Sequence, residues 1–184
     1  AELLGSHGLT AAQMLVTLDD LEDRRRYLNV AATLGRLLSL GVVPVINEND
    51  TVATEEIRFG DNGRLAARVG SAAGASGVVL LSDVDGLYDA NPHGNPDAKL
   101  IPLVESIDAR IAAMADGGSS SGMGSGGMVS KISAARIATA AGAHLAIVSG
   151  HTDDPLAALD QIETVRANRA TREPVPAALL PAGA

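Results

Sequence analysis

A glycine-rich segment that ends in a lysine has the residue types best suited to binding phosphate. It reads Gly122-Met123-Gly124-Ser125-Gly126-Gly127-Met128-Val129-Ser130-Lys131. Glycines let backbone N–H groups approach a phosphate closely, and a helix that starts near Met128 would add the positive end of its dipole. Lys131, one turn into that helix, could reach a terminal phosphate as a point charge. The spacing is not that of a Walker A loop, and a flexible Gly/Ser linker with a solvated lysine is the alternative interpretation.

Polar residues also follow three predicted strands, at the point where each strand ends. They are Asn47 to Asp50 after a strand at 42–46, Ser82 to Gly86 after one at 78–81, and Ser149 to His151 after one at 147–148. Ligands in open α/β sheets bind beyond the carboxyl ends of the strands, so these residues are candidates for one shared site. Loop starts are polar in any case, and for each cluster alone that interpretation stays equally open.

A further acidic candidate, Asp61, lies beside Asn62 at the predicted start of a helix. Its ordinary role would be a helix N-cap. A functional Asp61 would instead accept hydrogen bonds from cationic groups around a phosphoryl group in transfer. The histidines show no metal-ligand spacing, so we read them as surface or loop residues and predict no protein metal site; they are His7, His93, His144 and His151.

The elements that must position these residues alternate between strands and helices. We expect strands at 11–17, 42–46, 77–81 and 145–148, a possible arm at 55–60 and a loop at 83–97. Helices are expected from Asp19 or Asp20 to Gly41, from Asn62 to near Gly74, at 106–115, from Met128 and from Pro155. This order predicts an α/β fold with a mostly parallel sheet. The strand at 77–81 is apolar without alternation, which is typical of a strand covered on both faces.

Composition narrows the class of protein. The chain has 184 residues, 46% hydrophobic and 20% charged, which suits one globular domain or a large part of one. Only 2% are aromatic, so the core must consist of Ala, Leu, Ile and Val. A net charge of −8 argues against an extended nucleic-acid site. No apolar run is long enough to span a membrane, and the absence of cysteine excludes disulfides and Cys-bound zinc and fits a reducing cytosol.

Together these segments resemble the glutamate 5-kinases of the amino acid kinase family. The matching stretches are LEDRRRYLN at 21–29, VINEND at 45–50, EIRFGDN at 56–62, LLSDVDGLY at 80–88 and GSGGMVSK at 124–131. The likeness covers roughly residues 1–160 in unbroken order, and the INEND and GDN segments distinguish it from aspartokinases and uridylate kinases. We therefore expect a partial amino acid kinase domain at 1–163, its nucleotide-binding portion, and a loosely ordered tail at 164–184.

The resemblance implies a sheet sandwiched between helices and phosphorylation of the side-chain carboxylate of L-glutamate by ATP with Mg²⁺. The product would be glutamyl 5-phosphate, the first intermediate toward proline. It also implies a cytoplasmic enzyme that is a homo-oligomer when intact. The implied catalytic residues are Lys131 and Asp61, and the implied glutamate-binding residues are Asn47, Asp50 and Asn62. The implied ATP-binding residues are Ser82, Asp83, Ser125, Gly126, Gly127, Met128, Val129, Ser130 and Lys131.

Three departures from the family pattern accompany this resemblance. Set against the family, we expect these 184 residues to lack an N-terminal segment with a glycine loop, a first catalytic lysine and a substrate-binding Ser-Gly loop. Gly63 stands where an acidic residue is usual, and there is no room for the C-terminal RNA-binding-like domain of many members. We expect the chain alone to phosphorylate glutamate at least about a thousandfold more slowly than an intact enzyme.

Two alternatives stay open. One is a catalytically incomplete nucleotide-binding fragment or subunit. The other is a different amino acid kinase, such as an aspartokinase or carbamate kinase, which Asn47 to Asp50 and Asp61-Asn62 disfavour.

Overall fold

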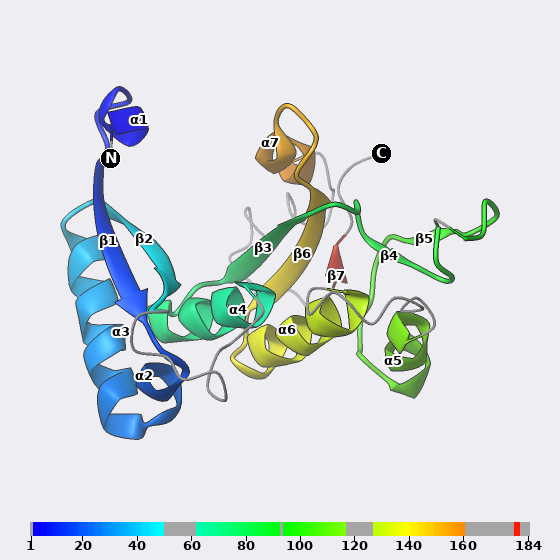
Figure 1. The fold of residues 1–184 in the computed structure, drawn as a ribbon, viewed down its shortest axis with the longest axis horizontal. Coiled ribbons are helices and arrows are strands. Elements are labelled where there is room, and N and C mark those ends of the chain that lie inside the picture. Colours follow the sequence, from blue (N-terminus) through cyan, green and yellow to red (C-terminus); the bar gives the residue numbers. More distant parts are fainter. Residues whose placement is uncertain (1, 50–61, 93, 117–126, 161–178, 181–184) are drawn as a thin grey trace. The chain divides into compact units, whose positions relative to one another are not determined.

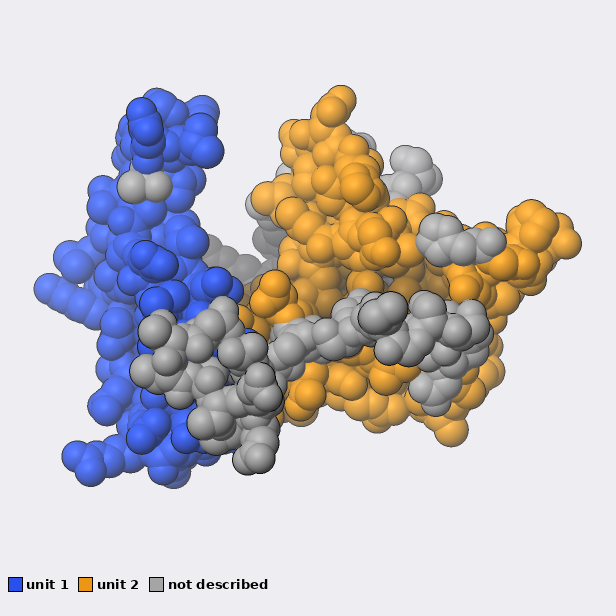
Figure 2. All heavy atoms as spheres, in the orientation of Figure 1, with its two compact units in different colours: residues 1–60, 72–74 blue, residues 61–71, 75–184 orange. Residues whose placement is uncertain are grey.

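A computed structural model describes residues 2–49, 62–92, 94–116, 127–160 and 179–180 (Figure 1). In chain order the elements are α1 (Glu2–Gly5), β1 (Thr10–Val16), α2 (Leu18–Glu22), α3 (Arg24–Ser39), β2 (Val42–Glu48), α4 (Asn62–Ala73), β3 (Gly77–Ser82), β4 (Leu87–Tyr88), β5 (Leu100–Ile101), α5 (Ala109–Asp116), α6 (Met128–Ala140), β6 (His144–Ser149), α7 (Pro155–Asp160) and β7 (Leu179–Leu180). The chain forms two compact units (Figure 2). The first comprises residues 1–60 and 72–74, and the second residues 61–71 and 75–184.

The first unit is built on a parallel pair of strands, β1 and β2. Thr10 lies opposite Val42 and Val16 opposite Glu48. Parallel strands cannot be joined by a tight turn, so the chain crosses over through α2 and α3. The α3 helix packs against β2 and buries Leu34 completely, at 0% exposure. The predicted strand at 42–46 is thus confirmed and extends to Glu48.

The connection between these strands is two helices, so the prediction of one helix from Asp19 or Asp20 is wrong. Thr17 is the N-cap of α2, and its backbone N–H and hydroxyl both donate to Asp20 Oδ2 at 2.8 Å. Asp23 is extended and ends α2, and its carboxylate accepts from the Arg26 N–H at 2.9 Å to cap α3. An aspartate side chain that competes for backbone N–H groups favours such a break. Gly41, with φ +70°, ends the second helix as predicted.

The second unit contains a parallel sheet in the order β3-β6-β7. Its strand β6 is buried on both faces, with Leu145, Ile147 and Val148 all at 0% exposure. In β3, by contrast, Val78 and Leu80 are buried while Val79 and Leu81 are 37% and 59% exposed. Coverage on both faces was therefore the wrong prediction for β3. The helices of this unit pack on only one face of that strand, among the residues described.

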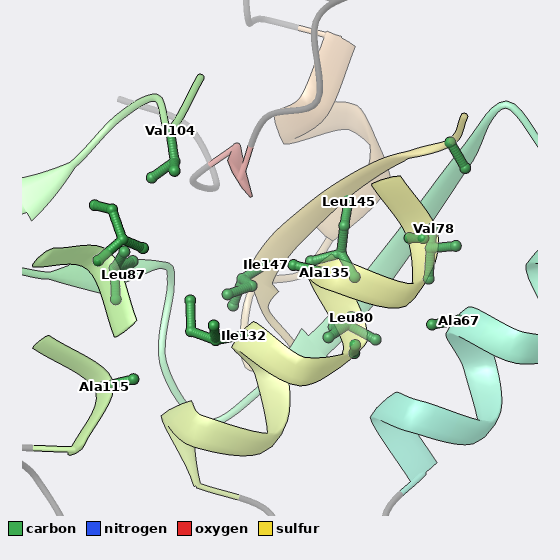
Figure 3. Close-up of a cluster of buried hydrophobic side chains, with 14 residues drawn as sticks. Ala67, Val78, Leu80, Leu87, Val104, Ala115, Ile132, Ala135, Leu145 and Ile147 are labelled. Carbon is green, nitrogen blue, oxygen red and sulfur yellow. The ribbon is translucent and has the colours of Figure 1, made fainter. Parts of the chain in front are cut away.

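The core of the second unit lies between this face of the sheet and the helices α4 and α6 (Figure 3). Ala135 of α6 and Ala67 of α4 pack among the branched side chains of β3 and β6. Because these side chains are small, helix and sheet lie close together. The core has few aromatic side chains to fill a wider gap. The closest approach is at Gly70, where an added β-carbon would lie 2.8 Å from Val78 Cγ2. Glycine is therefore required for this helix to sit on the strand.

A short antiparallel hairpin, β4–β5, was missed by the sequence prediction of a loop at 83–97. Leu87 pairs with Ile101 and Tyr88 with Leu100. The following helix α5 begins at Ala109, three residues later than predicted. The Asp108 carboxylate accepts from the Ile111 N–H at 2.9 Å, and such a side chain fixes the first turn at that point.

Three further helices begin where predicted: α4 at Asn62, α6 at Met128 and α7 at Pro155. The short helix α1 was not predicted. The predicted arm at 55–60 lies outside the described residues, as does most of the tail at 164–184. In that tail Leu179–Leu180 forms β7, which pairs in parallel with β6. No helix in the described ranges is long and apolar enough to cross a membrane.

Candidate active site

The site centres on an ion pair between Lys131 and Asp83. Lys131 lies in the first turn of α6, and Asp83 directly follows β3. The Lys131 Nζ atom is 3.8 Å from Asp83 Oδ1. The lysine side chain is only 13% exposed, whereas the aspartate side chain is 76% exposed. Of the prediction that Lys131 points into a cleft beside Ser82 and Asp83, the structure shows the contact with Asp83. The cleft and the chemical roles of the two residues stay predictions.

Ser82 fixes the aspartate and the end of its strand. The Ser82 hydroxyl donates to Asp83 Oδ1 at 2.8 Å and accepts from the Val84 N–H at 3.3 Å. The Ser82 carbonyl oxygen accepts from the Gly150 N–H at 2.7 Å. The carboxyl ends of β3 and β6 are therefore tied together, and the carboxylate is held beside them. This is the edge of a parallel sheet at which ligands bind.

The N-terminal end of α6 adds positive charge to this edge. Gly127 is the N-cap, and no side chain forms a capping hydrogen bond there. Helix geometry gives the N–H groups of Met128 and Val129 no partner inside the helix, and the dipole places partial positive charge at this end. Long helical side chains lean toward the N-terminus, so the Lys131 ammonium reinforces that charge. The arrangement suits an anion, such as a phosphate group.

Two further carboxylates, those of Asp85 and Asp89, order the segment after Asp83. The sequence did not indicate these roles. The Tyr88 hydroxyl donates to Asp85 Oδ1 at 2.8 Å, and this hydrogen bond, aided by burial, raises the pKa of Tyr88. The Asp89 carboxylate accepts from the Lys99 N–H at 2.8 Å and closes the β4–β5 hairpin. The available signal was a tyrosine three residues after Asp85, in the sequence Asp85-Gly86-Leu87-Tyr88. These bonds give the loop a defined shape next to the ion pair.

The residues expected to bind glutamate are placed only in part. Asn47 is the penultimate residue of β2 in the first unit and is exposed, and Asn62 begins α4 in the second unit. Asp50 and Asp61 lie outside the described residues, as do Ser125 and Gly126 of the glycine segment. The common pocket expected for Asn47, Asp50, Asp61 and Asn62 therefore stays a prediction.

Metal binding by the protein alone has no support within the described part of the chain. No group of three or more His, Asp or Glu side chains gathers there in a way that could hold an ion. A Mg²⁺ ion carried by a nucleotide needs less, because phosphate oxygens and water supply most of its ligands.

The sequence and the fold match a known family. Residues 1–149 match the model of the amino acid kinase family, and the chain belongs to that family. The crystal structure of E. coli aspartokinase III in complex with lysine and aspartate, in its T-state, superposes with a TM-score of 0.50. It is 20% identical and the match covers 83% of this chain and 35% of that one, so the comparison shows the shared α/β fold alone.

The curated relatives that match at high identity are glutamate 5-kinases. The chain is 76% identical over 156 residues to the glutamate 5-kinase of Sphingopyxis alaskensis, covering 85% of this chain and 42% of the relative. It is 68% identical over 158 residues to that of Novosphingobium aromaticivorans, covering 86% and 42%. It is 68% identical over 156 residues to that of Zymomonas mobilis, and the match covers 85% of this chain and 39% of that relative. The resemblance noted from the sequence is confirmed, and the chain spans about two fifths of these relatives.

Proposed function

We propose that this chain forms the nucleotide-binding portion of an ATP-dependent glutamate 5-kinase. The reaction moves the γ-phosphoryl group of ATP onto the side-chain carboxylate of L-glutamate and yields glutamyl 5-phosphate, an intermediate toward proline. The observation that carries this proposal is the largely buried Lys131 side chain, whose ammonium lies 3.8 Å from Asp83 at the N-terminal end of α6. The high identity to glutamate 5-kinases supports the choice of acceptor.

The nucleotide phosphates are proposed to lie at the N-terminal end of α6. Gly127, Met128 and Val129 offer backbone N–H groups there. Ser125, Gly126 and Ser130 of the same segment are proposed to contact the nucleotide as well, on the match to the family. Lys131 contributes a full positive charge to the transferring phosphoryl group. Phosphoryl transfer depends on positioning and charge neutralisation rather than on a strong protein nucleophile. Ser82 and Asp83 border this place through their hydrogen bond and the ion pair to Lys131.

The acceptor is proposed to lie against Asn47, Asp50 and Asn62. A glutamate side-chain carboxylate is ionised at neutral pH, so it attacks phosphorus without a general base. Amide side chains can orient a charged amino acid without neutralising it. Asp61 is proposed to hold the cationic groups around the phosphoryl group in place. The proposal that glutamate is the acceptor depends on these four residues, and their assignment rests on the match to the family.

Mg²⁺ is proposed to arrive bound to ATP. It would neutralise negative charge on the β- and γ-phosphates. The described side chains supply only part of the positive charge needed for this. Lys131 is the described cation that would share this neutralisation with the metal. The enzyme is further proposed to work in the cytoplasm as a homo-oligomer.

The second candidate is a nucleotide-binding fragment or subunit without catalysis of its own. The observation that favours it is the coverage of about two fifths of the relatives' length. Both candidates predict nucleotide binding at Lys131. They differ in whether this chain, supplied with the rest of a relative, completes an active kinase.

A chimera separates the two candidates. The matched 156 residues of the Sphingopyxis alaskensis relative are replaced by the corresponding residues of this chain, and acyl phosphate is trapped with hydroxylamine. We expect ATP-dependent product with glutamate and little with aspartate. The unmodified relative and the 184-residue chain alone are measured in parallel. An inactive chimera with unchanged thermal stability and nucleotide affinity would contradict the kinase proposal and leave the binding fragment.

A further inference from the structure

The ion pair at the proposed nucleotide site is asymmetric in burial. Lys131 is mostly enclosed, at 13% exposure, while its partner Asp83 is 76% exposed. The aspartate is nevertheless held in place, because its Oδ1 atom accepts from the Ser82 hydroxyl at 2.8 Å. A carboxylate that is tethered by a neighbour but open to solvent can be displaced without unpacking the core.

We propose that Asp83 is a positioning residue that competes with nucleotide phosphate for the Lys131 ammonium. It holds the lysine in place and at the same time lowers the affinity for the polyphosphate of ATP and of ADP. This inference rests on the proposed function and adds that the charge of Asp83 lowers the affinity for the nucleotide. A residue that only contacted the nucleotide would raise the affinity.

The argument follows from charge and distance. A phosphate on Lys131 would share one ammonium with the Asp83 carboxylate, which already lies 3.8 Å from it. Two anions that share one ammonium lie close enough to repel each other, and the repulsion is greater near a protein surface than in bulk water. Asp83 can turn toward solvent, but it then loses the hydrogen bond from Ser82. Either way, binding a polyphosphate costs more with Asp83 present than without its charge.

The same competition favours release of the product. ADP retains a negatively charged terminal phosphate, and Asp83 recaptures the Lys131 ammonium as that phosphate leaves. The lysine therefore has an anion at this position, Asp83 or a phosphate, both before and after the nucleotide leaves. Asp83 thus keeps Lys131 in place through each cycle.

The test is the affinity for MgADP, measured by isothermal titration on the 184-residue chain and on the chimera described above. Asp83→Asn removes the charge and keeps an oxygen that can accept from Ser82. We expect it to tighten MgADP binding about two- to fivefold, the range of an exposed ion pair, and less at high salt. Asp97→Asn, a change of the same charge on an exposed residue of the β4–β5 connection, should leave the affinity unchanged.

A double-mutant cycle shows whether the effect passes through the lysine. In a Lys131→Met background, Asp83→Asn should no longer change MgADP affinity, because the competed charge is gone. Ser82→Ala, which frees the carboxylate to turn away, should also tighten binding, and it serves as the second variant if Asp83→Asn does not fold. Weaker or unchanged MgADP binding in Asp83→Asn overturns the proposal, and so does equal tightening in the Lys131→Met background.

The affinity measurement is independent of catalysis. A chimera that phosphorylates glutamate but shows no tightening in Asp83→Asn retains the proposed function and refutes the role of Asp83. A chimera that binds MgADP more tightly in Asp83→Asn but transfers no phosphoryl group supports the role of Asp83 and contradicts the proposed function.

Discussion

Gly70 of α4 and Val78 of β3 approach so closely that a β-carbon on residue 70 would lie 2.8 Å from the valine Cγ2 atom. Real β-carbons essentially never lie so near another atom, and the valine is itself buried among the side chains that join α4, α6 and the sheet. The contact sets how near α4 can come to the strand that ends at Ser82. The packing of Gly70 against Val78 therefore helps to fix the position of β3, the strand that leads to Ser82 and Asp83.

Gly70→Ala is expected to destabilise the protein by about 1–2 kcal/mol. Overpacking costs about 1–3 kcal/mol, and the better helix propensity of alanine offsets up to about 1 kcal/mol of that. The matched control is Gly35→Ala in the middle of α3, where an added β-carbon meets nothing within 4 Å. This control should stabilise by about 0.5–1 kcal/mol. Urea unfolding monitored by circular dichroism measures both, and a stabilising Gly70→Ala would show that the contact is not limiting.

Lys131→Ala is expected to lower kcat of the active chimera by about a hundredfold or more, because one preorganised charge at the phosphoryl group is lost. Arg136→Ala removes a positive charge from an exposed position on the same helix and should change kcat less than about twofold. Hydroxylamine trapping at saturating ATP and glutamate measures both. Equal losses in the two variants would mean that helix charge in general, rather than Lys131, supports the reaction.

The cap of α2 is expected to weaken in acid. Burial raises the pKa of Asp20, but hydrogen bonds from the Thr17 N–H and hydroxyl outweigh it, with the Arg26 guanidinium 3.5 Å away, so the pKa is lowered overall. Its stabilising contribution is thus present above the unfolded-state pKa of about 4 and is lost as the pH falls through the lower folded-state value.

Asp20→Asn should therefore lower the melting temperature at neutral pH, and the difference from the parent should shrink in acid. Asp19→Asn, a change on the neighbouring exposed residue, is the control and should have the smaller effect of a helix-end charge. Melting temperatures recorded between neutral and acidic pH test the prediction. A constant difference across that range would speak against a cap that depends on ionised Asp20.

Tyr88 is expected to resist ionisation in alkali. Its hydrogen bond to Asp85, with burial and the charge of that carboxylate, raises the pKa of Tyr88. A raised folded-state pKa contributes stability below the unfolded-state value of about 10, and this contribution is lost as the pH rises through the folded-state value. Tyr27→Phe leaves Tyr88 as the single tyrosine, because the chain has two, and its ionisation can be followed by near-ultraviolet absorbance. Asp85→Asn in that background should lower the observed pKa; an unchanged value would refute the role of Asp85.

Much of the candidate site was predictable because parallel α/β geometry is regular. The apolar run at 77–81 and the helical period after Met128 located β3 and α6, and the start of α6 then had to lie near the end of the neighbouring strand. This geometry alone predicts that Lys131 lies beside Asp83. Ser82 was also identified, since it follows the strand directly.

The features that the sequence did not reveal depend on local competition or on long-range placement. Leu21 and Leu28 keep a helical spacing across the break at Asp23, so periodicity alone could not show that its side chain caps a new helix. The strands β4 and β5 have two residues each, too few for an alternating pattern. The grouping of Asn47 with Asn62 depends on how two separate units are placed, which no local pattern encodes.

The pairing of β3 with β6 has a consequence for biosynthesis. Gly77 pairs with His144 and Ser82 with Ser149, so the partner of β3 is made only after the hairpin, α5 and α6 have been synthesised. At ordinary translation rates that interval is on the order of several seconds. During this interval the backbone of β3 lacks its partner strand, and its apolar side chains lack the part of their cover that α6 supplies. The nascent chain therefore exposes an unpaired strand edge, the kind of surface that chaperones shield, until β6 has emerged.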